Sequence, residues 1–262
     1  MKLKIGVIGG GNMGAAIVSK IKNKYNVSVC EKDSARQKFI KSKFKVRVGD
    51  LTAIVKNAKI IILAVKPQDF DQILREVAAV IRQDQLVISI AAGITTQYIE
   101  KRLGAGIKVI RTMPNLPAQI GQGMTGICIG KNATRADLKQ AVKIFDNIGK
   151  TIVVQEKWMD AITAVSGSGP AYVFLFVECL MNAAKNLGFN EEQAKTLINQ
   201  TLRGSLSLLE NSKDDAQTLR SFVTSKGGTT LAAMDVFFAK DIEDIFTEAL
   251  KAAKKRAAEL AK

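Results

Sequence analysis

The sequence predicts an α/β Rossmann domain with a mostly parallel sheet, followed by an all-α C-terminal domain. Short apolar strands alternate with helix-like segments through about residue 156. A glycine-rich GxGxxG pattern at 9–14 connects the first strand to the first helix. Beyond about residue 158 no convincing strand pattern remains. We therefore expect one domain over residues 1–157 and an all-helical domain over 158–262.

The first domain is justified by its order of elements. Strands are expected at 3–8, 27–30, 60–65, 86–91, 107–113, 125–130 and 151–156. Helix-like segments lie between them, such as AAIVSKI at 15–21 and DFDQILREVAAVI at 69–81. This alternation indicates a parallel sheet with helices on both faces.

The second domain reads as a series of helices. They are expected at 161–188, 191–210, 230–240 and 244–262. Gly188 is a plausible stop for the first of these helices, and Asn190 with the two glutamates after it starts the next. No internal repeat or low-complexity linker interrupts the series.

The charge balance favours small anionic partners. The chain has 39 Lys and Arg against 24 Asp and Glu, a net charge of +15. The densest basic cluster, Lys251 to Arg256, lies near the end of a helix, where cations complement the helix dipole. We therefore expect no nucleic-acid partner. No apolar run looks long enough to span a bilayer, so no membrane association is expected.

Cysteine and histidine usage excludes several kinds of site. Cys30, Cys128 and Cys179 are far apart among apolar neighbours, which favours buried, reduced thiols in a cytoplasmic protein. The chain has no histidine. This excludes a Ser-His-Asp triad and a histidine-based metal site, and no metal is expected.

The first glycine loop predicts a dinucleotide site. Gly9 permits the tight turn, Gly11 lets the backbone approach a pyrophosphate, and Gly14 allows close helix packing. The helix that follows would direct its N-terminus at the phosphates. The alternative is a glycine-rich turn that binds nothing.

The acidic residue expected about twenty residues further on is Glu31. Its carboxylate would bind the ribose 2′-hydroxyl of NADH and repel the 2′-phosphate of NADPH. The adjacent Lys32 could bind that phosphate, and Glu31 could turn away in an NADP enzyme. On balance NADPH is expected, with NADH as the alternative.

The second glycine segment, SKGGTT at 225–230, lacks the pattern of a nucleotide phosphate loop, as does GSGP at 167–170. It is better interpreted as a helix N-terminus capped by Ser225 or Thr229, with exposed amides that could bind a small anion. The Thr230 hydroxyl could donate a hydrogen bond. The alternative is a capped interhelical turn without a ligand.

Five motifs appear in a characteristic order: GGGNMG, AVKPQ at 64–68, SIAAGI at 89–94, GSGPAY at 167–172 and SKGGTT. Together they resemble the pyrroline-5-carboxylate reductase family over essentially the whole chain. The resemblance implies reduction of the cyclic imine 1-pyrroline-5-carboxylate to L-proline with NAD(P)H, the last step of proline biosynthesis. It also implies a helical substrate-binding and dimerisation domain that intertwines with a partner, giving a homodimer or larger homo-oligomer.

The same resemblance implies the site residues. The substrate carboxylate would be bound by Ser225, Gly227, Gly228, Thr229 and Thr230, with Thr230 as the catalytic contact to the ring nitrogen. The cofactor would be bound by Gly9, Gly11, Asn12, Met13, Gly14, Glu31, Lys32, Ala64, Val65, Lys66, Pro67, Ala91, Ala92 and Gly93, with Met113, Pro114 and Asn115 nearby.

Two positions depart from the family pattern. Lys226 stands where the family usually has proline, which removes a rigid φ and adds a cation. Glu31-Lys32 replaces the Asn-Arg or Ser-rich turn typical of NADPH-dependent members. The chemistry still fits, because an imine that arrives protonated needs only a weak donor such as Thr230, and the cofactor supplies the hydride.

Three alternatives stay open. A reductase of another cyclic imine would use the same motifs. A lysine-dependent 3-hydroxyacid dehydrogenase would need a lysine soon after GSGP, whereas the first is Lys185. A non-catalytic nicotinamide sensor would not need the SKGGTT segment.

Overall fold

The computed structural model describes residues 2–260 of the chain. The chain divides into two compact units, one formed by residues 1–170 with 252–262 and the other by 171–251. We call them the sheet unit and the helical unit and describe each by itself. The sequence placed a domain boundary at residue 157, where the strand pattern ends. The two compact units are defined by a different criterion, so the boundary at 157 stays a prediction.

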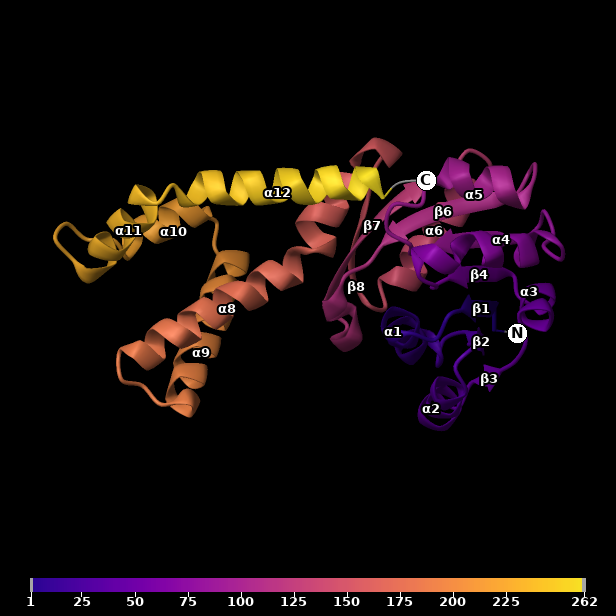
Figure 1. Cartoon of the computed structure of the whole chain (residues 1–262), viewed down its shortest axis with the longest axis horizontal. Coiled ribbons are helices and arrows are strands. Elements are labelled where there is room, and N and C mark those ends of the chain that lie inside the picture. The colour runs from indigo at the N-terminus through magenta and orange to yellow at the C-terminus, as the bar shows by residue number, and fades with distance from the viewer. Residues whose placement is uncertain (1, 261–262) are drawn as a thin grey trace. The chain divides into compact units, whose positions relative to one another are not determined.

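The sheet unit contains eight strands in the order β3-β2-β1-β4-β5-β6-β7-β8 (Figure 1). Their bounds are Lys4–Ile8, Asn26–Cys30, Arg47–Val48, Ile60–Leu63, Leu86–Ser89, Lys108–Met113, Gly123–Ile129 and Gly149–Val153, numbered β1 to β8 along the chain. Every neighbouring pair is parallel except β6 and β7, which run antiparallel. The expected mostly parallel Rossmann sheet is confirmed.

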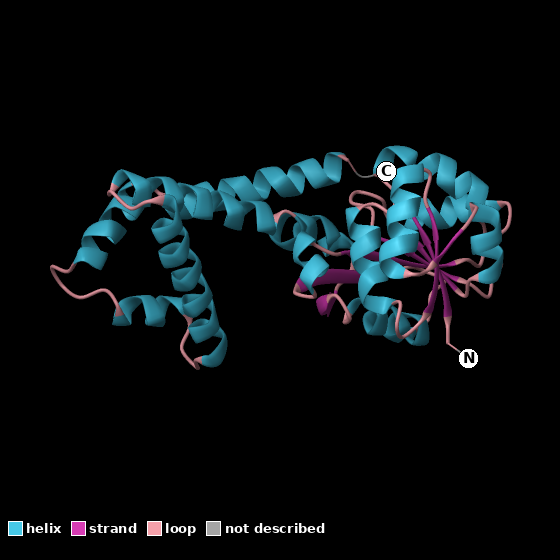
Figure 2. Ribbon diagram, turned by 90° about the horizontal axis from the view of Figure 1, so that it is seen from below, coloured by secondary structure: helices cyan, strands magenta, loops and turns pink. Residues whose placement is uncertain are grey.

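Helices cover both faces of this sheet (Figure 2). They are α1 Asn12–Ile21, α2 Ser34–Phe44, α3 Leu51–Asn57, α4 Phe70–Ala78, α5 Thr96–Leu103 and α6 Arg135–Phe145, followed by the short α7 Met159–Ile162. Apolar side chains form a separate core on each face. All four residues of β4 and of β5 are buried, which explains why these strands read as continuous apolar runs rather than alternating ones.

Several element bounds differ from the sequence expectation. The last strand ends at Val153 rather than at 156, because Glu156 begins a 3₁₀ turn that leads into the following helices. The two-residue strand β3 was not anticipated, since a strand this short carries no periodicity. Helices α2 and α3 begin at aspartate caps, Asp33 and Asp50, that mark their starts in the sequence.

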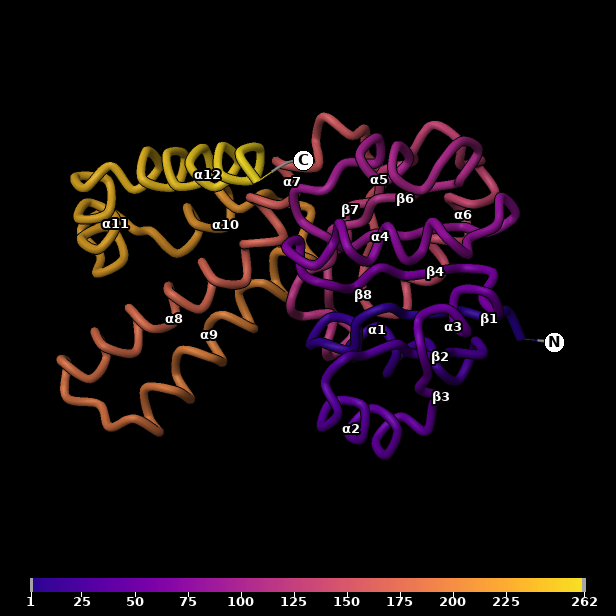
Figure 3. Tube along the Cα trace, turned by 45° about the vertical axis from the view of Figure 1, so that its right-hand side comes forward, coloured from indigo at the N-terminus to yellow at the C-terminus, as the bar shows by residue number. Residues whose placement is uncertain are grey.

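The helical unit is built from α8 Gly169–Asn186, α9 Glu191–Asn211, α10 Ala216–Phe222 and α11 Thr229–Ala239, and the last helix, α12 Ile242–Glu259, begins in it. Helices α8 and α9 run side by side (Figures 1 and 3). The expected end of the final helix at residue 262 lies outside the described residues. The expected all-helical character of this region is confirmed.

The turn between α8 and α9 follows the sequence signals. Gly188 has φ 99°, a left-handed conformation that favours glycine and ends α8. Asn190 caps α9, and its side chain and that of Gln193 each accept a hydrogen bond from the other residue's backbone amide.

The helical unit buries very little. Within residues 171–251 only Ala194 and Ile198 are buried. Large apolar side chains are instead exposed, including four consecutive residues of α8, Val173 to Phe176, that are 43–59% exposed. Exposed apolar surface of this extent marks an interaction site.

Two expectations need correction. Residues 156–186 form a helical stretch long and apolar enough to cross a membrane by length and composition, so the sequence does contain such a run. The cysteines are not uniformly buried: Cys128 is buried, Cys30 is half-buried and Cys179 on α8 is exposed.

Candidate functional site

The glycine loop Gly9–Gly14 joins β1 to α1 and is shaped by its own contacts. Gly9 has φ 104°, and a Cβ atom there would lie 2.5 Å from the Ala64 carbonyl oxygen. A Cβ atom on Gly14 would lie 2.1 Å from the Gly9 carbonyl oxygen. Glycine at these two positions is therefore required by the fold itself.

Gly11 is different, because the protein does not require glycine there. Its φ of −61° suits any residue, and no described atom lies within 4 Å of the position that a Cβ would take. It is the N-cap of α1, and no described side chain caps that end or brings an acidic group to its first turn. Open space beside uncapped amides fits a bound phosphate group. The residues present therefore fit a dinucleotide.

The other predicted cofactor residues lie at the same edge of the sheet. Glu31 follows β2, Ala64–Pro67 follow β4, Ala91–Gly93 follow β5 and Met113–Asn115 end or follow β6. These strands are neighbours and parallel, so their carboxyl ends meet at one edge. The strand order reverses between β1 and β4, and ligands of open α/β sheets bind at such a switch point.

Glu31 lies against the glycine loop. Its Oε2 atom accepts a 2.6 Å hydrogen bond from the Gly10 amide, and its Oε1 atom accepts one of 3.0 Å from the Asp33 amide. Lys32 is instead 82% exposed and pairs with Asp69, Nζ to Oδ2 3.1 Å. Glu31 and Lys32 were the two residues that favoured NADH and NADPH, respectively. The structure places the Glu31 carboxylate against the glycine loop and the Lys32 ammonium group beside Asp69.

The SKGGTT segment belongs to the helical unit and forms the turn before α11. Gly227 has φ 71°, and the Gly228 amide donates a 3.0 Å hydrogen bond to the Ser225 carbonyl. The N-cap of α11 is Gly228, and no described side chain caps it. The expectation that Ser225 or Thr229 caps this helix is therefore wrong, since Ser225 lies three residues before the cap and Thr229 is the first helical residue. The free amides at this end are a suitable environment for a carboxylate.

Sequence reasoning missed a buried polar cluster between the sheet and the segment that leads to α8. Arg111 on β6 is 2% exposed, and its Nη1 atom lies 2.6 Å from Glu156 Oε1. Its Nη2 atom is 3.6 Å from Asp160 Oδ1. The sequence held only a partial signal. Arg111 stands in a strand with several apolar residues, IKVIRTM, and a buried arginine needs an acidic partner, but nothing local identifies Glu156 as that partner.

Glu156 is the centre of this cluster. Besides Arg111, the Thr96 hydroxyl donates to its Oε2 atom at 2.7 Å, and the Cys128 thiol lies 3.4 Å from the same atom. Burial alone would raise the pKa of Glu156, but the hydrogen bonds from Thr96 and Arg111 outweigh it and lower the pKa. Burial, and then the neighbouring Glu156 carboxylate, raise the pKa of Cys128 to about 12.

Further contacts fix the segment that precedes α8. Asn115 donates a 2.9 Å hydrogen bond to the Ser166 carbonyl and accepts one of 2.8 Å from the Met124 amide. Residues Thr163–Gly167 form a π-helical turn, a feature found frequently at functional sites. The Asn115 loop after β6, predicted to lie near the cofactor, is thus tied to the turn that leads into GSGP.

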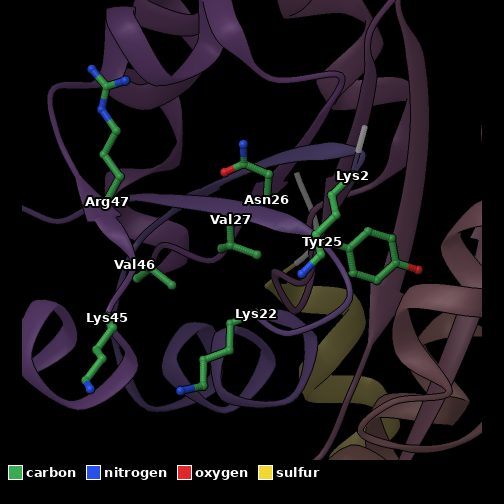
Figure 4. Close-up of a pocket in the computed structure, with 8 residues that line it drawn as sticks. All are labelled: Lys2, Lys22, Tyr25, Asn26, Val27, Lys45, Val46 and Arg47. Carbon is green, nitrogen blue, oxygen red and sulfur yellow. The ribbon is translucent and has the colours of Figure 1, made fainter.

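A cavity of about 450 Å³ lies elsewhere on the sheet unit (Figure 4). It is lined by Lys2, Lys22, Tyr25, Asn26, Val27, Lys45, Val46 and Arg47. Asn26 and Val27 begin β2, so the cavity lies at the amino end of that strand, away from the glycine loop. The four cations in Figure 4 do not point toward a common centre. None of the predicted site residues lines it.

Comparison with known families places two matches on the chain. Residues 156–260 match the family described as pyrroline-5-carboxylate reductase dimerisation. Residues 4–93 match the family described as NADP oxidoreductase, coenzyme F420-dependent.

Individual relatives match over almost the whole chain. Pyrroline-5-carboxylate reductase of Methanosarcina acetivorans is 36% identical, over 99% of this chain and 98% of its own length. The structure of a pyrroline-5-carboxylate reductase from Coxiella burnetii is 36% identical, covers all of both chains and superposes with a TM-score of 0.91. The Plasmodium falciparum pyrroline carboxylate reductase crystallised with NADP bound is 29% identical over 99% of this chain, with a TM-score of 0.89.

Proposed function

The chain belongs to the pyrroline-5-carboxylate reductase family, and we propose that it reduces the C=N bond of 1-pyrroline-5-carboxylate to give L-proline, using a nicotinamide dinucleotide. The observation that carries this function within the structure is the open space at Gly11 beside the uncapped start of α1. The SKGGTT turn provides a second uncapped helix start, at α11. The two sites suit a dinucleotide phosphate and a substrate carboxylate.

When bound, the dinucleotide supplies the hydride that adds to the imine carbon. The amides of Asn12 and Met13 would receive its pyrophosphate at the start of α1, where the helix dipole favours negative charge. The segments Ala64–Pro67 and Ala91–Gly93 would line its path along the carboxyl edge of the sheet. Gly93, with φ 72°, gives the second of these segments a turn that a side chain would strain.

The SKGGTT turn would position the substrate. Its carboxylate would accept hydrogen bonds from free amides at the start of α11, among them that of Thr229. Thr230 stands one residue further along the helix, and its hydroxyl would hold the ring nitrogen, which carries the proton in the reactive iminium form. Because that proton arrives with the substrate, the absence of histidine from the chain is consistent with this chemistry.

We also propose that the protein works as a homo-oligomer in the cytoplasm. The exposed apolar residues of α8 lie within the region that matches the dimerisation family, residues 156–260. A second copy would cover this surface, which also accounts for the apolar stretch at 156–186 without a membrane. A dimer or larger assembly is consistent with the family and with the burial pattern.

The experiment that tests the function follows oxidation of NADH and NADPH by the purified protein with 1-pyrroline-5-carboxylate. Thr230→Ala should lower turnover at least tenfold while leaving dinucleotide binding unchanged, and Thr230→Ser should restore much of it. Full turnover by Thr230→Ala would remove the role assigned to its hydroxyl. No turnover with either dinucleotide in the wild-type protein would contradict the proposed reaction.

Gly11→Val separates the two sites. Valine would fill the open space at Gly11 and should weaken dinucleotide binding about 100-fold or more, because the backbone could no longer approach the pyrophosphate. The fold should be kept, since no described atom of the protein lies within 4 Å of the added Cβ. Normal dinucleotide binding by this variant would contradict the assignment of the loop.

One specific observation favours a second candidate, a reductase of a different cyclic imine. Lys226 adds an exposed cation to the turn before α11, at the position where the resemblance to the family leads us to expect proline. A substrate with a second anionic group would gain from that charge. Comparison of substrates in the wild-type protein and in Lys226→Pro distinguishes the two candidates.

A further inference from the structure

We infer that Glu31 makes NADH the preferred cofactor of this enzyme and discriminates against NADPH. This inference rests on the proposed function, because it concerns the dinucleotide bound at the glycine loop. It deepens that function by assigning the choice of cofactor to one carboxylate and its position.

Three hydrogen bonds hold Glu31, two to its carboxylate and one to its backbone carbonyl. Its two oxygens accept hydrogen bonds from the Gly10 and Asp33 amides, at 2.6 and 3.0 Å. Its backbone carbonyl accepts a 2.6 Å hydrogen bond from the side chain of Gln37 on α2. The carboxylate therefore points into the glycine loop, where the adenosine ribose of a dinucleotide binds.

Packing keeps the Gly10 amide beside this carboxylate. A Cβ atom on Gly10 would lie 2.1 Å from the Cδ1 atom of Ile40. Ile40 is fully buried and belongs to the core on that face of the sheet. The loop cannot move toward α2 without disturbing that core, so the hydrogen bond between Glu31 and Gly10 is held by the fold.

Lys32 and Arg36, two cations that follow Glu31 in the sequence, are each held by groups other than its carboxylate. Lys32 extends into solvent and pairs with Asp69, and thus does not neutralise Glu31. Arg36 uses its Nε atom to donate a 2.7 Å hydrogen bond to the Gly10 carbonyl, and its guanidinium carbon lies 4.9 Å from the centre of the Phe39 ring. Its Nη2 atom lies 3.4 Å from Asn12 Oδ1. Arg36 therefore borders the loop and is held there by its contacts with Gly10, Asn12 and the Phe39 ring.

These positions favour a ribose with a free 2′-hydroxyl. The hydroxyl can donate a hydrogen bond to the carboxylate, whereas a 2′-phosphate would bring a second anion against it. The sequence expectation of NADPH depended on Glu31 turning away from the site and on Lys32 receiving the phosphate. In the structure Glu31 faces the loop and Lys32 pairs with Asp69, so we now expect NADH rather than NADPH.

The test measures dissociation constants of NADH and NADPH without any imine, by titration calorimetry, for the wild-type protein and Glu31→Gln. The amide keeps the size of the side chain and can still accept from Gly10, but it removes the negative charge. We expect the wild-type protein to bind NADH at least about tenfold more tightly, and the variant to lose most of this difference through tighter NADPH binding. Asp84→Asn, the same change at an exposed carboxylate paired with Lys59, should leave the ratio unchanged.

Wild-type binding of NADPH as tight as that of NADH would overturn the inference, as would a ratio that Glu31→Gln changes less than twofold. Both outcomes leave the proposed function intact, because the imine assay is separate. Binding of neither dinucleotide would overturn this inference and the proposed function together. Thermal melting of each variant verifies that it is folded.

Discussion

The two units of this protein use apolar residues in opposite ways. The sheet unit places its isoleucines, valines and leucines in two cores, one on each face of the sheet. The helical unit has a comparably apolar helix, α8, yet none of its residues is buried within the chain. The sheet unit therefore has the burial that a stable domain needs, whereas the helical unit lacks it until another surface covers it.

The largest expected effect comes from a charge placed on the exposed face of α8. Phe174→Glu should weaken self-association about 100-fold or more, because a central aromatic contact is lost and a carboxylate is desolvated. Phe174 is 52% exposed, so the change should cost the isolated chain little. Mass measurement by light scattering over a range of protein concentrations would detect the dissociation.

Thr52→Glu, at an exposed position of helix α3 in the sheet unit, is the matched control and should leave the assembly unchanged. If Phe174→Glu associates as the wild-type protein does, the exposed apolar residues of α8 do not form the self-association surface. The helical unit would then need another explanation for its exposed face.

The next effect concerns the sheet unit. Arg111→Met should lower the free energy of unfolding by about 3 kcal/mol, because Glu156 and Asp160 would lose their buried cation. Denaturant titration of the whole protein, followed by circular dichroism, measures this loss. Self-association should hardly change in the folded variant. A loss below about 1 kcal/mol would mean that water replaces the arginine at this position.

A smaller effect is expected at the start of α9. Asn190→Ala removes the cap of that helix and should cost about 1 kcal/mol. Amide hydrogen exchange should rise in the first turn of α9, while the strands of the sheet unit keep their protection. Increased exchange in both units would show that they unfold together, which would contradict their independence.

The smallest effect depends on pH. Because the pKa of Glu156 is lowered in the folded protein, its charged form stabilises the fold above the unfolded pKa, and this stabilisation is lost as the pH falls through the folded pKa. Unfolding measured between neutral and acidic pH should therefore show a steeper acid loss in the wild-type protein than in Glu156→Gln. If the stability of both proteins falls equally steeply with falling pH, other carboxylates are responsible for the acid sensitivity.

Much of the sheet unit could be predicted from the sequence. Buried parallel strands are short, continuously apolar and separated by helices, and β4 and β5 carry this pattern without interruption. The glycine loop could be placed because its GxGxxG pattern comes directly after the apolar residues of β1. The strand β3 and the antiparallel pairing of β6 with β7 could not, since pairing direction depends on contacts between distant residues.

The candidate site was predicted in part. The sequence located the turn before α11, but it suggested Ser225 or Thr229 as the cap, whereas the backbone turn at Gly227 places Gly228 there. The residue types of Glu31 and Lys32 did not show which of the two side chains faces the cofactor. That depends on tertiary contacts, the hydrogen bond from the Gly10 amide to Glu31 and the ion pair of Lys32 with Asp69. The cluster around Arg111 joins residues 45 positions apart and has no local pattern.

The unequal exposure of the three cysteines offers a chemical reporter of assembly. Thiol reagents attack the thiolate, and burial, which raises the pKa of both Cys30 and Cys128, lowers the thiolate fraction of these two side chains. Cys179 is exposed on α8, the helix whose exposed apolar residues we propose a second copy covers. A maleimide should modify Cys179 rapidly in the dissociated Phe174→Glu chain and slowly in the assembled protein, so alkylation followed by mass spectrometry would report subunit exchange in real time.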